Sequence, residues 1–406
     1  LSAYDNMDNS HDTTSFNYIA DFGNLELSAT MYENDFARNW FKVDKIDNNK
    51  VYGHGNGINN IIASANAGEA TALAILNGTN AQAVQIKLKN NNRVYTSEGT
   101  DLKLQFNTDK QSLTIGYRDT EDSEDRFQVY ATTDWMNGKL GALTIGSNPG
   151  YSSNNRLTTA EATAFYINEE INFGALTINV GFRSEEWKIS QDRYVDAARS
   201  AINTEEGYPK KLADADNSLM GFGATYDMND TTQLFFGFHE GFTPTGGGAD
   251  PEEADNMEMG IRYAKDDTYF EAIYFDTDYQ NMFGECTASG GATGSCEIGD
   301  SFNAGEASIT GFELVAQTER LGESGTMYPF SMVYTSTDAS FDNTFESNFW
   351  GSVTSGMDIP DLPDSQLALQ AGFETQTGLR GSATYYAYGR TCSVASCALG
   401  TSVDSY

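Results

Sequence analysis

Long hydrophobic runs are absent from this 406-residue chain, and no segment approaches the roughly 18 apolar residues of a membrane-spanning helix. A membrane location is still compatible with this, because a barrel strand needs only about 9–11 residues and hides its apolar face in alternation. The mean hydropathy of −0.47 therefore fits a soluble protein and also a barrel with large polar loops.

Basic residues are also scarce, since 24 Lys and Arg face 58 Asp and Glu and leave a formal charge of −34. Such a charge repels phosphate backbones, so we expect no nucleic-acid partner. The acidic segments 119–127 and 250–258 lie between strand candidates and are interpreted as solvated loops, with divalent-cation or lipopolysaccharide chemistry left as the alternative. No segment has the ligand spacing of an EF-hand, so we assign no metal site.

Histidines and catalytic motifs are nearly missing. The chain has three histidines, His11, His54 and His239, and no GxSxG, HExxH or GxxxxGK[ST] segment. The glycines at 246–248 lack the lysine of a phosphate-binding loop. We therefore expect no enzyme activity and no cofactor, and we interpret the histidines as structural or surface residues.

The four cysteines form two close pairs, Cys286 with Cys296 and Cys392 with Cys397, within stretches rich in Gly, Ser and Ala. Neither pair has the His or the second CxxC of a zinc site. Two local disulfides are the simplest interpretation, and they require an oxidising compartment such as the periplasm.

Glycine and aromatic residues are abundant, with 39 Gly, 22 Tyr and 24 Phe against 7 Pro, which favours all-β structure. Alternating segments flank seven tight turns, and long connections join the hairpins. The turns are predicted at 22–24, 107–110, 172–174, 227–230, 265–267, 320–325 and 374–378, and the connections at 35–93, 119–160, 188–216, 240–256, 279–307 and 338–363. Short turns on one rim and long loops on the other are typical of bacterial outer-membrane barrels.

One apolar face is expected to contact lipid along the whole wall, while polar partners face inward. In the longest connection, residues 59–76 predict one helix that ends at Asn77-Gly78, with its apolar side chains packed inside the loop. The residues predicted to face lipid are Leu27, Leu104, Ile178, Phe236 and Leu369.

Several ordered segments resemble a known family. GFHEGFTP at 237–244, PEEADNMEMGIRY at 251–263, YFDTDYQNMF at 274–283 and NAGEASITGFEL at 303–314 are similar to successive blocks of TonB-dependent outer-membrane receptors, the energised importers of metal chelates. Four more resemble receptors for ferric dicitrate, namely YENDFARNWFKV at 32–43, NNNRVYTSEG at 90–99, YRDTEDSEDRFQVY at 117–130 and IPDLPDSQLALQAGFE at 359–374.

The resemblance implies an all-β fold, an antiparallel up-and-down transmembrane β-barrel wall with about 14 strands of an expected 22. Residues 1–406 would be a partial barrel domain without the plug domain, and its first and last strands would not pair with each other. The implied partners are a ferric chelate such as ferric citrate or another siderophore, the TonB complex through the missing plug, and outer-membrane lipid. A passive diffusion pore, closed with 14 strands, and an adhesin or enzyme on a barrel remain as alternatives.

Four arginines are the candidate ligand-binding residues, because a ferric carboxylate complex is an anion that suits guanidinium donors. All four lie in or beside the long connections, and Arg38, Arg93 and Arg126 lie inside the segments that carry the resemblance. Salt bridges between these arginines and the surrounding acid are the competing interpretation. The four are Arg38, Arg93, Arg126 and Arg156.

Overall fold

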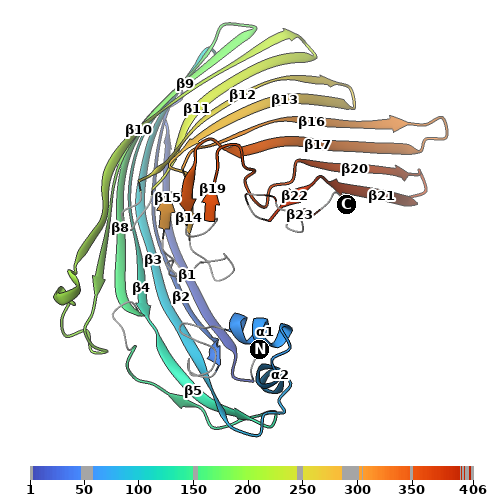
Figure 1. Ribbon diagram of the computed structural model, residues 1–406. Coiled ribbons are helices and arrows are strands. Elements are labelled where there is room, and N and C mark those ends of the chain that lie inside the picture. Colours follow the sequence, from blue (N-terminus) through green and yellow to red (C-terminus); the bar gives the residue numbers. More distant parts are fainter. Residues whose placement is uncertain are drawn as a thin grey trace.

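The computed structural model describes residues 3–46, 58–149, 154–244, 250–285, 301–303, 305–347, 351–393, 395, 397 and 402–403. Most of this chain forms one large antiparallel sheet of long strands that follow one another in sequence order (Figure 1). The long strands are β1 (Asn6–Asp21), β2 (Leu25–Ile46), β3 (Val84–Thr108), β4 (Gln111–Phe127), β8 (Asn155–Asn172), β9 (Leu176–Arg193), β10 (Lys210–Asn229), β11 (Thr232–Thr243), β12 (Glu252–Lys265), β13 (Thr268–Gln280), β16 (Ala307–Leu321), β17 (Met327–Phe341), β20 (Ser365–Glu374) and β21 (Arg380–Tyr388).

Each long strand pairs with the long strands before and after it, which makes an up-and-down wall. The wall curves and stays open, as Figure 1 shows. Within the described ranges, β1 pairs only with β2 and β21 only with β20. The predicted all-β wall and its unpaired end strands are both confirmed.

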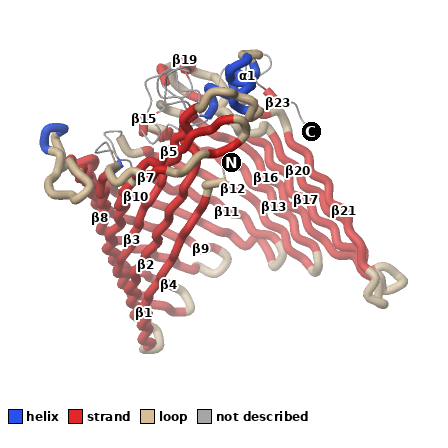
Figure 2. Tube along the Cα trace, turned by 90° about the horizontal axis from the view of Figure 1, so that it is seen from below, coloured by secondary structure: helices blue, strands red, loops and turns tan. Residues whose placement is uncertain are grey.

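The two ends of the wall differ, because tight turns join the strands at one end and the long connections lie at the other (Figure 2). All seven predicted turns are present between strands of the wall. The long connections hold the remaining elements. These are α1 (Ile58–Asn66), α2 (Ala70–Leu76), β5 (Val129–Met136), β6 (Lys139–Leu140), β7 (Thr144–Ile145), the 3₁₀ helix η3 (Thr204–Glu206), β14 (Phe283–Glu285), β15 (Ser301–Asn303), β18 (Phe345–Ser347), β19 (Gly351–Val353), β22 (Thr391–Cys392) and β23 (Ser402–Val403).

The strands run further toward the long connections than the sequence predicted. The predicted loop 35–93 is strand up to Ile46 and again from Val84, and the acidic segment 119–127 is the end of β4. The apolar alternation that marks a strand stops where both faces are polar, but the backbone ladder continues past that point. The bounds predicted for the long connections were therefore too wide.

One face of the wall carries an apolar band that runs across the strands of the sheet. Leu27 pairs directly with Leu104, and directly opposed residues point to the same side of a sheet. The remaining predicted lipid-facing residues, Ile178, Phe236 and Leu369, share this face through the continuous register. Large apolar side chains on it are exposed to solvent, which is the surface that a lipid environment would cover.

On the opposite, polar face of the described wall, four aromatic rings lie over glycines that pair with them directly on the neighbouring strand. The clearest case is Tyr166, because a Cβ added to Gly116 would come within 2.0 Å of its ring. No side chain larger than hydrogen fits beneath such a ring without displacing it. The four pairs are Tyr32 over Gly99, Tyr166 over Gly116, Phe235 over Gly260 and Phe275 over Gly311.

The single helix predicted over 59–76 is two helices. Gly68 ends α1 in the left-handed region, with φ +84°, and Glu69 then caps α2 by accepting hydrogen bonds from the Thr71 and Ala72 backbone N–H groups. The predicted stop at Asn77-Gly78 is confirmed. Neither α1 nor α2, nor any other helix in the described part of the chain, has the length and apolarity needed to cross a membrane.

Small apolar cores hold the long connections together. The apolar residues of α1 and α2 pack on one another and on Ile46, Val84 and Trp135, as predicted. Another core joins the connections after β13, β17 and β21 around Phe341 and Val353.

The predicted disulfide bond between Cys392 and Cys397 is present, with Cα atoms 5.1 Å apart. The pair Cys286 and Cys296 lies outside the described residues.

Candidate functional site

An arginine row crosses five neighbouring strands at the end of the wall that carries the long connections. Direct register partners link β2, β3, β4, β8 and β9, so the side chains project from the same, polar face. The row comprises Arg38, Arg93, Arg126, Arg156 and Arg193.

The fifth member, Arg193, was missed in the sequence, although a signal for it exists. β8 and β9 form a hairpin around the predicted turn at 172–174, and counting outward from that turn places Arg193 opposite Arg156. Arg193 is the last residue of β9, and the end of this strand falls in the predicted connection 188–216. Alternation alone therefore did not give its position in the register.

Three arginines of the row converge on one carboxylate, that of Glu124 on β4. Glu124 Oε2 accepts a hydrogen bond from Arg93 Nη1 at 2.8 Å. Glu124 Oε1 accepts from Arg126 Nε and from Arg156 Nη2, each at 3.2 Å. The four side chains are only 17–22% exposed, so water screens these charges less than at an open surface.

Aromatic and amide groups hold the rest of the row. Arg93 also donates to Asn91 Oδ1 at 3.0 Å and to the Tyr95 hydroxyl at 3.1 Å. The Arg38 guanidinium lies 5.7 Å from the centroid of the same Tyr95 ring. At the other end, the Arg193 guanidinium lies 4.7 Å from the centroid of the Tyr208 ring, in the range of a cation–π contact.

The charges in the row are incompletely balanced, because three guanidinium groups share a single carboxylate. Burial, the nearby Arg156 and, to a smaller extent, Arg93 lower the pKa of Arg126 to about 10, against the opposing effect of Glu124. Burial alone would raise the pKa of Glu124, but Arg126, Arg93 and Arg156 together hold it below its usual value. At neutral pH both groups are charged, and the cluster keeps a local positive excess.

The arginine row lies beyond the part of β4 that is predicted to span the membrane. Leu113, Ile115 and Tyr117 are the apolar residues on the outward face of this strand, whereas Asp119 and Glu121 occupy the next outward positions. A carboxylate facing lipid would be costly, so lipid contact ends below Asp119. Arg126 therefore lies beyond the apolar band, at the end of the wall that carries the long connections, which we call the mouth.

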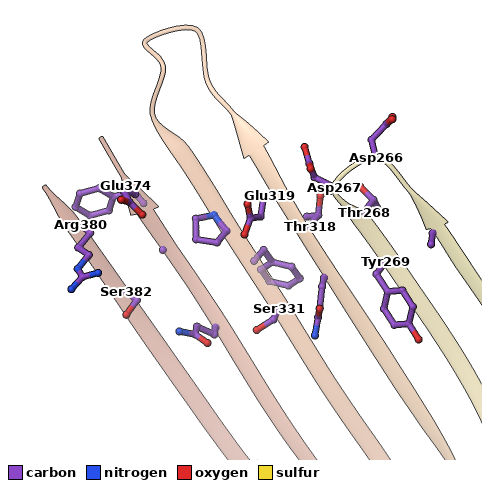
Figure 3. A pocket seen from close by; sticks show the side chains of 18 residues that line it. Asp266, Asp267, Thr268, Tyr269, Thr318, Glu319, Ser331, Glu374, Arg380 and Ser382 are labelled. Atoms are coloured by element: carbon purple, nitrogen blue, oxygen red, sulfur yellow. Dashed lines mark hydrogen bonds between the residues drawn. The ribbon is translucent and has the colours of Figure 1, made fainter. Parts of the chain in front are cut away.

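A hollow lies at the tight-turn end of the polar face, at the opposite end from the arginine row (Figure 3). Its volume is about 750 Å³, and β12, β13, β16, β17, β20 and β21 form it. Asp267, Glu319 and Glu374 line it together with Arg380, so carboxylates outnumber guanidinium groups there. This surface suits a polar or cationic neighbour better than an anion.

The predicted site residues therefore have different environments. Arg93, Arg126 and Arg156 come together on Glu124, and Arg38 lies beside them over Tyr95. The structure shows the salt bridges for Arg93, Arg126 and Arg156, and ligand binding by the four arginines stays a prediction. Of the histidines, His11 packs edge-on against Phe36 with ring centroids 5.9 Å apart, His239 lies on the polar face of β11, and His54 is outside the described residues.

The fold and the match to a known family define the class. Residues 2–406 match the family described as TonB dependent receptor-like, beta-barrel. The chain belongs to this family, whose members are transport receptors rather than enzymes. The resemblance of the sequence segments to TonB-dependent receptors is thereby confirmed.

Solved structures of similar shape are receptors for several different iron chelates. The siderophore receptor PiuA from Acinetobacter baumannii has a TM-score of 0.67 at 14% identity, over 99% of this chain and 57% of that one. The ferric yersiniabactin uptake receptor FyuA from Yersinia pestis gives 0.59 at 15%, over 100% and 54%. The ferric citrate transporter FecA in its unliganded form gives 0.64 at 12%, over 99% and 53%. The chain thus spans little more than half the length of these structures, which share its fold.

Proposed function

We propose that this chain forms part of the barrel of a bacterial outer-membrane receptor that imports a ferric chelate, with energy from the TonB complex transmitted through a plug domain. Family membership and the apolar outward face support the membrane and transport parts of this proposal. The convergence of Arg93, Arg126 and Arg156 at the mouth is the observation that carries the ligand part.

The arginine row suits an anionic chelate such as ferric citrate. Guanidinium groups stay charged, and their fork of N–H donors matches the two oxygens of a carboxylate. A chain with a net charge of −34 repels anions at long range, so capture needs basic groups concentrated at one place. The row provides that concentration, with five arginines on five adjacent strands and Glu124 as the carboxylate bound to three of them.

Replacing Arg126 by Ala tests the proposal in the complete protein. The change removes one charge-assisted contact, worth roughly 1.5–3 kcal/mol, and is expected to weaken ferric citrate binding about tenfold or more. Isothermal titration calorimetry in detergent measures this directly. Arg262→Ala is the matched control, because Arg262 also lies on the polar face but pairs with Glu271 and stacks on Phe235, away from the row.

Each outcome of the titration has a distinct meaning. Equal losses in Arg126→Ala and Arg262→Ala would show a general effect on the barrel and contradict a role for the row. No change in Arg126→Ala would make its contact with Glu124 a rim salt bridge only. If the wild-type protein bound neither ferric citrate nor any other anionic ferric chelate, the ligand proposal would be wrong, and a passive pore would be the better description.

A further inference from the structure

The Glu124 carboxylate lies within the arginine cluster formed by Arg93, Arg126 and Arg156. Its two oxygens take hydrogen bonds from three guanidinium groups on three strands, β3, β4 and β8. We propose that Glu124 is a resident stand-in for a ligand carboxylate, which fills the arginine cluster while the site is empty and gives way when a polycarboxylate anion binds. This inference rests on the proposed function and names the ligand class and the residue that competes with it.

The bonding of Glu124 makes such an exchange possible. Throughout the described ranges, every hydrogen bond that Glu124 accepts comes from an arginine side chain. A carboxylate with a purely structural role commonly takes backbone N–H groups or hydroxyls as well, and then cannot leave without exposing them. Glu124 can rotate away without breaking any backbone hydrogen bond, provided that another carboxylate replaces it.

The charge of the cluster favours replacement by an anion with more than one carboxylate. Arg93, Arg126 and Arg156 carry three positive charges against the single charge of Glu124, so an excess remains while the stand-in is bound. Two more donors in the row, Nε of Arg156 and Nε of Arg38, are buried and have no acceptor among the described residues. Buried donors left unpaired are costly, and an incoming ligand with several carboxylates can satisfy them.

A purely structural Glu124 and a stand-in Glu124 predict opposite effects of its removal. If Glu124 only holds the arginines in place, Glu124→Ala disperses them and weakens the binding of carboxylates. If it is a stand-in, the same change vacates a carboxylate position and raises the affinity for free carboxylates. The like charges of the three arginines also repel one another once Glu124 is gone, so the stand-in role predicts a less stable empty protein that small carboxylates stabilise again.

The test uses the complete protein in detergent, with iron-free citrate and acetate as probes. Glu124→Ala is expected to bind citrate at least tenfold more tightly than wild type by calorimetry. Its thermal midpoint should fall in chloride buffer and recover on addition of acetate or citrate. Glu121→Ala is the matched control, since it also removes one carboxylate from β4 but on the outward, exposed face, and it should behave as wild type.

Weaker or unchanged citrate binding by Glu124→Ala, with no recovery in acetate, would overturn the inference. If the alanine variant does not fold, Glu124→Gln keeps the side-chain volume, removes the charge and makes the same prediction for citrate. Wild-type titrations with ferric chelates separate the two proposals. If the wild-type protein binds no ferric chelate, the import function is contradicted. Tighter citrate binding by the Glu124 variant would still support the proposal that Glu124 stands in for a ligand carboxylate.

Discussion

The rings that cover glycines on the polar face should make Gly116 intolerant of a single methyl group. A Cβ on Gly116 would lie 2.0–2.4 Å from two ring carbons and the hydroxyl oxygen of Tyr166, so the ring must move off the strand. Overpacking of this kind costs typically 1–3 kcal/mol. The lower backbone entropy of alanine in the unfolded chain recovers about 0.4–1 kcal/mol. Gly116→Ala is therefore expected to destabilise the barrel by roughly 1–2 kcal/mol.

Gly223→Ala is the matched control, because its Cβ would meet only ordinary contacts, Asn179 Cβ and Phe236 O at 3.8 Å. That change should be neutral or stabilising by a few tenths of a kcal/mol up to about 1. Urea unfolding in detergent, followed by far-ultraviolet circular dichroism, measures both variants. In a Tyr166→Ala background the cost of Gly116→Ala should disappear, since the two residues are coupled. Equal and additive effects in both backgrounds would refute the reasoning.

Two further predictions concern pH and redox state. The affinity for an anionic ferric chelate should stay constant between about pH 6 and 8.5. The pKa of Glu124 is held below its usual value and that of Arg126, at about 10, lies above this range, so neither group changes its charge there. A midpoint near pH 6.5 in calorimetry would instead indicate a histidine. Replacing Cys392 and Cys397 together by Ser should leave the unfolding midpoint of the barrel unchanged but speed proteolysis near residue 392. A loop this short gains only about 2 kcal/mol from its disulfide, and it lies outside the large sheet. Equal protease resistance of the variant and the wild type would contradict this.

The sequence was sufficient to predict the wall, because its two signals are both local. Alternation assigns each side chain to a face, and turn residues such as Gly23 and Gly174 adopt the left-handed backbone that tight connections require. The strand ends were predicted less well. Beyond the apolar band both faces are polar, so nothing in the residue pattern distinguishes a ladder from a loop.

The site was only partly predictable, for a similar reason. Residue type and position beside the long connections were enough to select Arg93, Arg126 and Arg156, but the role of Glu124 depends on which strands lie next to one another. The acidic segment around Glu124 resembles any solvated run of carboxylates until the cross-strand register places three guanidinium groups around one of them. The break between α1 and α2 was missed because Gly68 is one small residue within an otherwise helical stretch.

The extension of β4 beyond its apolar band sets the height of the arginine row above the bilayer. Tyr117 is the last outward apolar residue, and Arg126 follows it along the same strand. At about 3.3 Å per residue and a tilt of roughly 40°, the guanidinium groups lie on the order of 20 Å above the lipid boundary. That height is more than twice the Debye length of about 8 Å at physiological ionic strength. The phosphate groups of the membrane surface are thus screened from the arginine row.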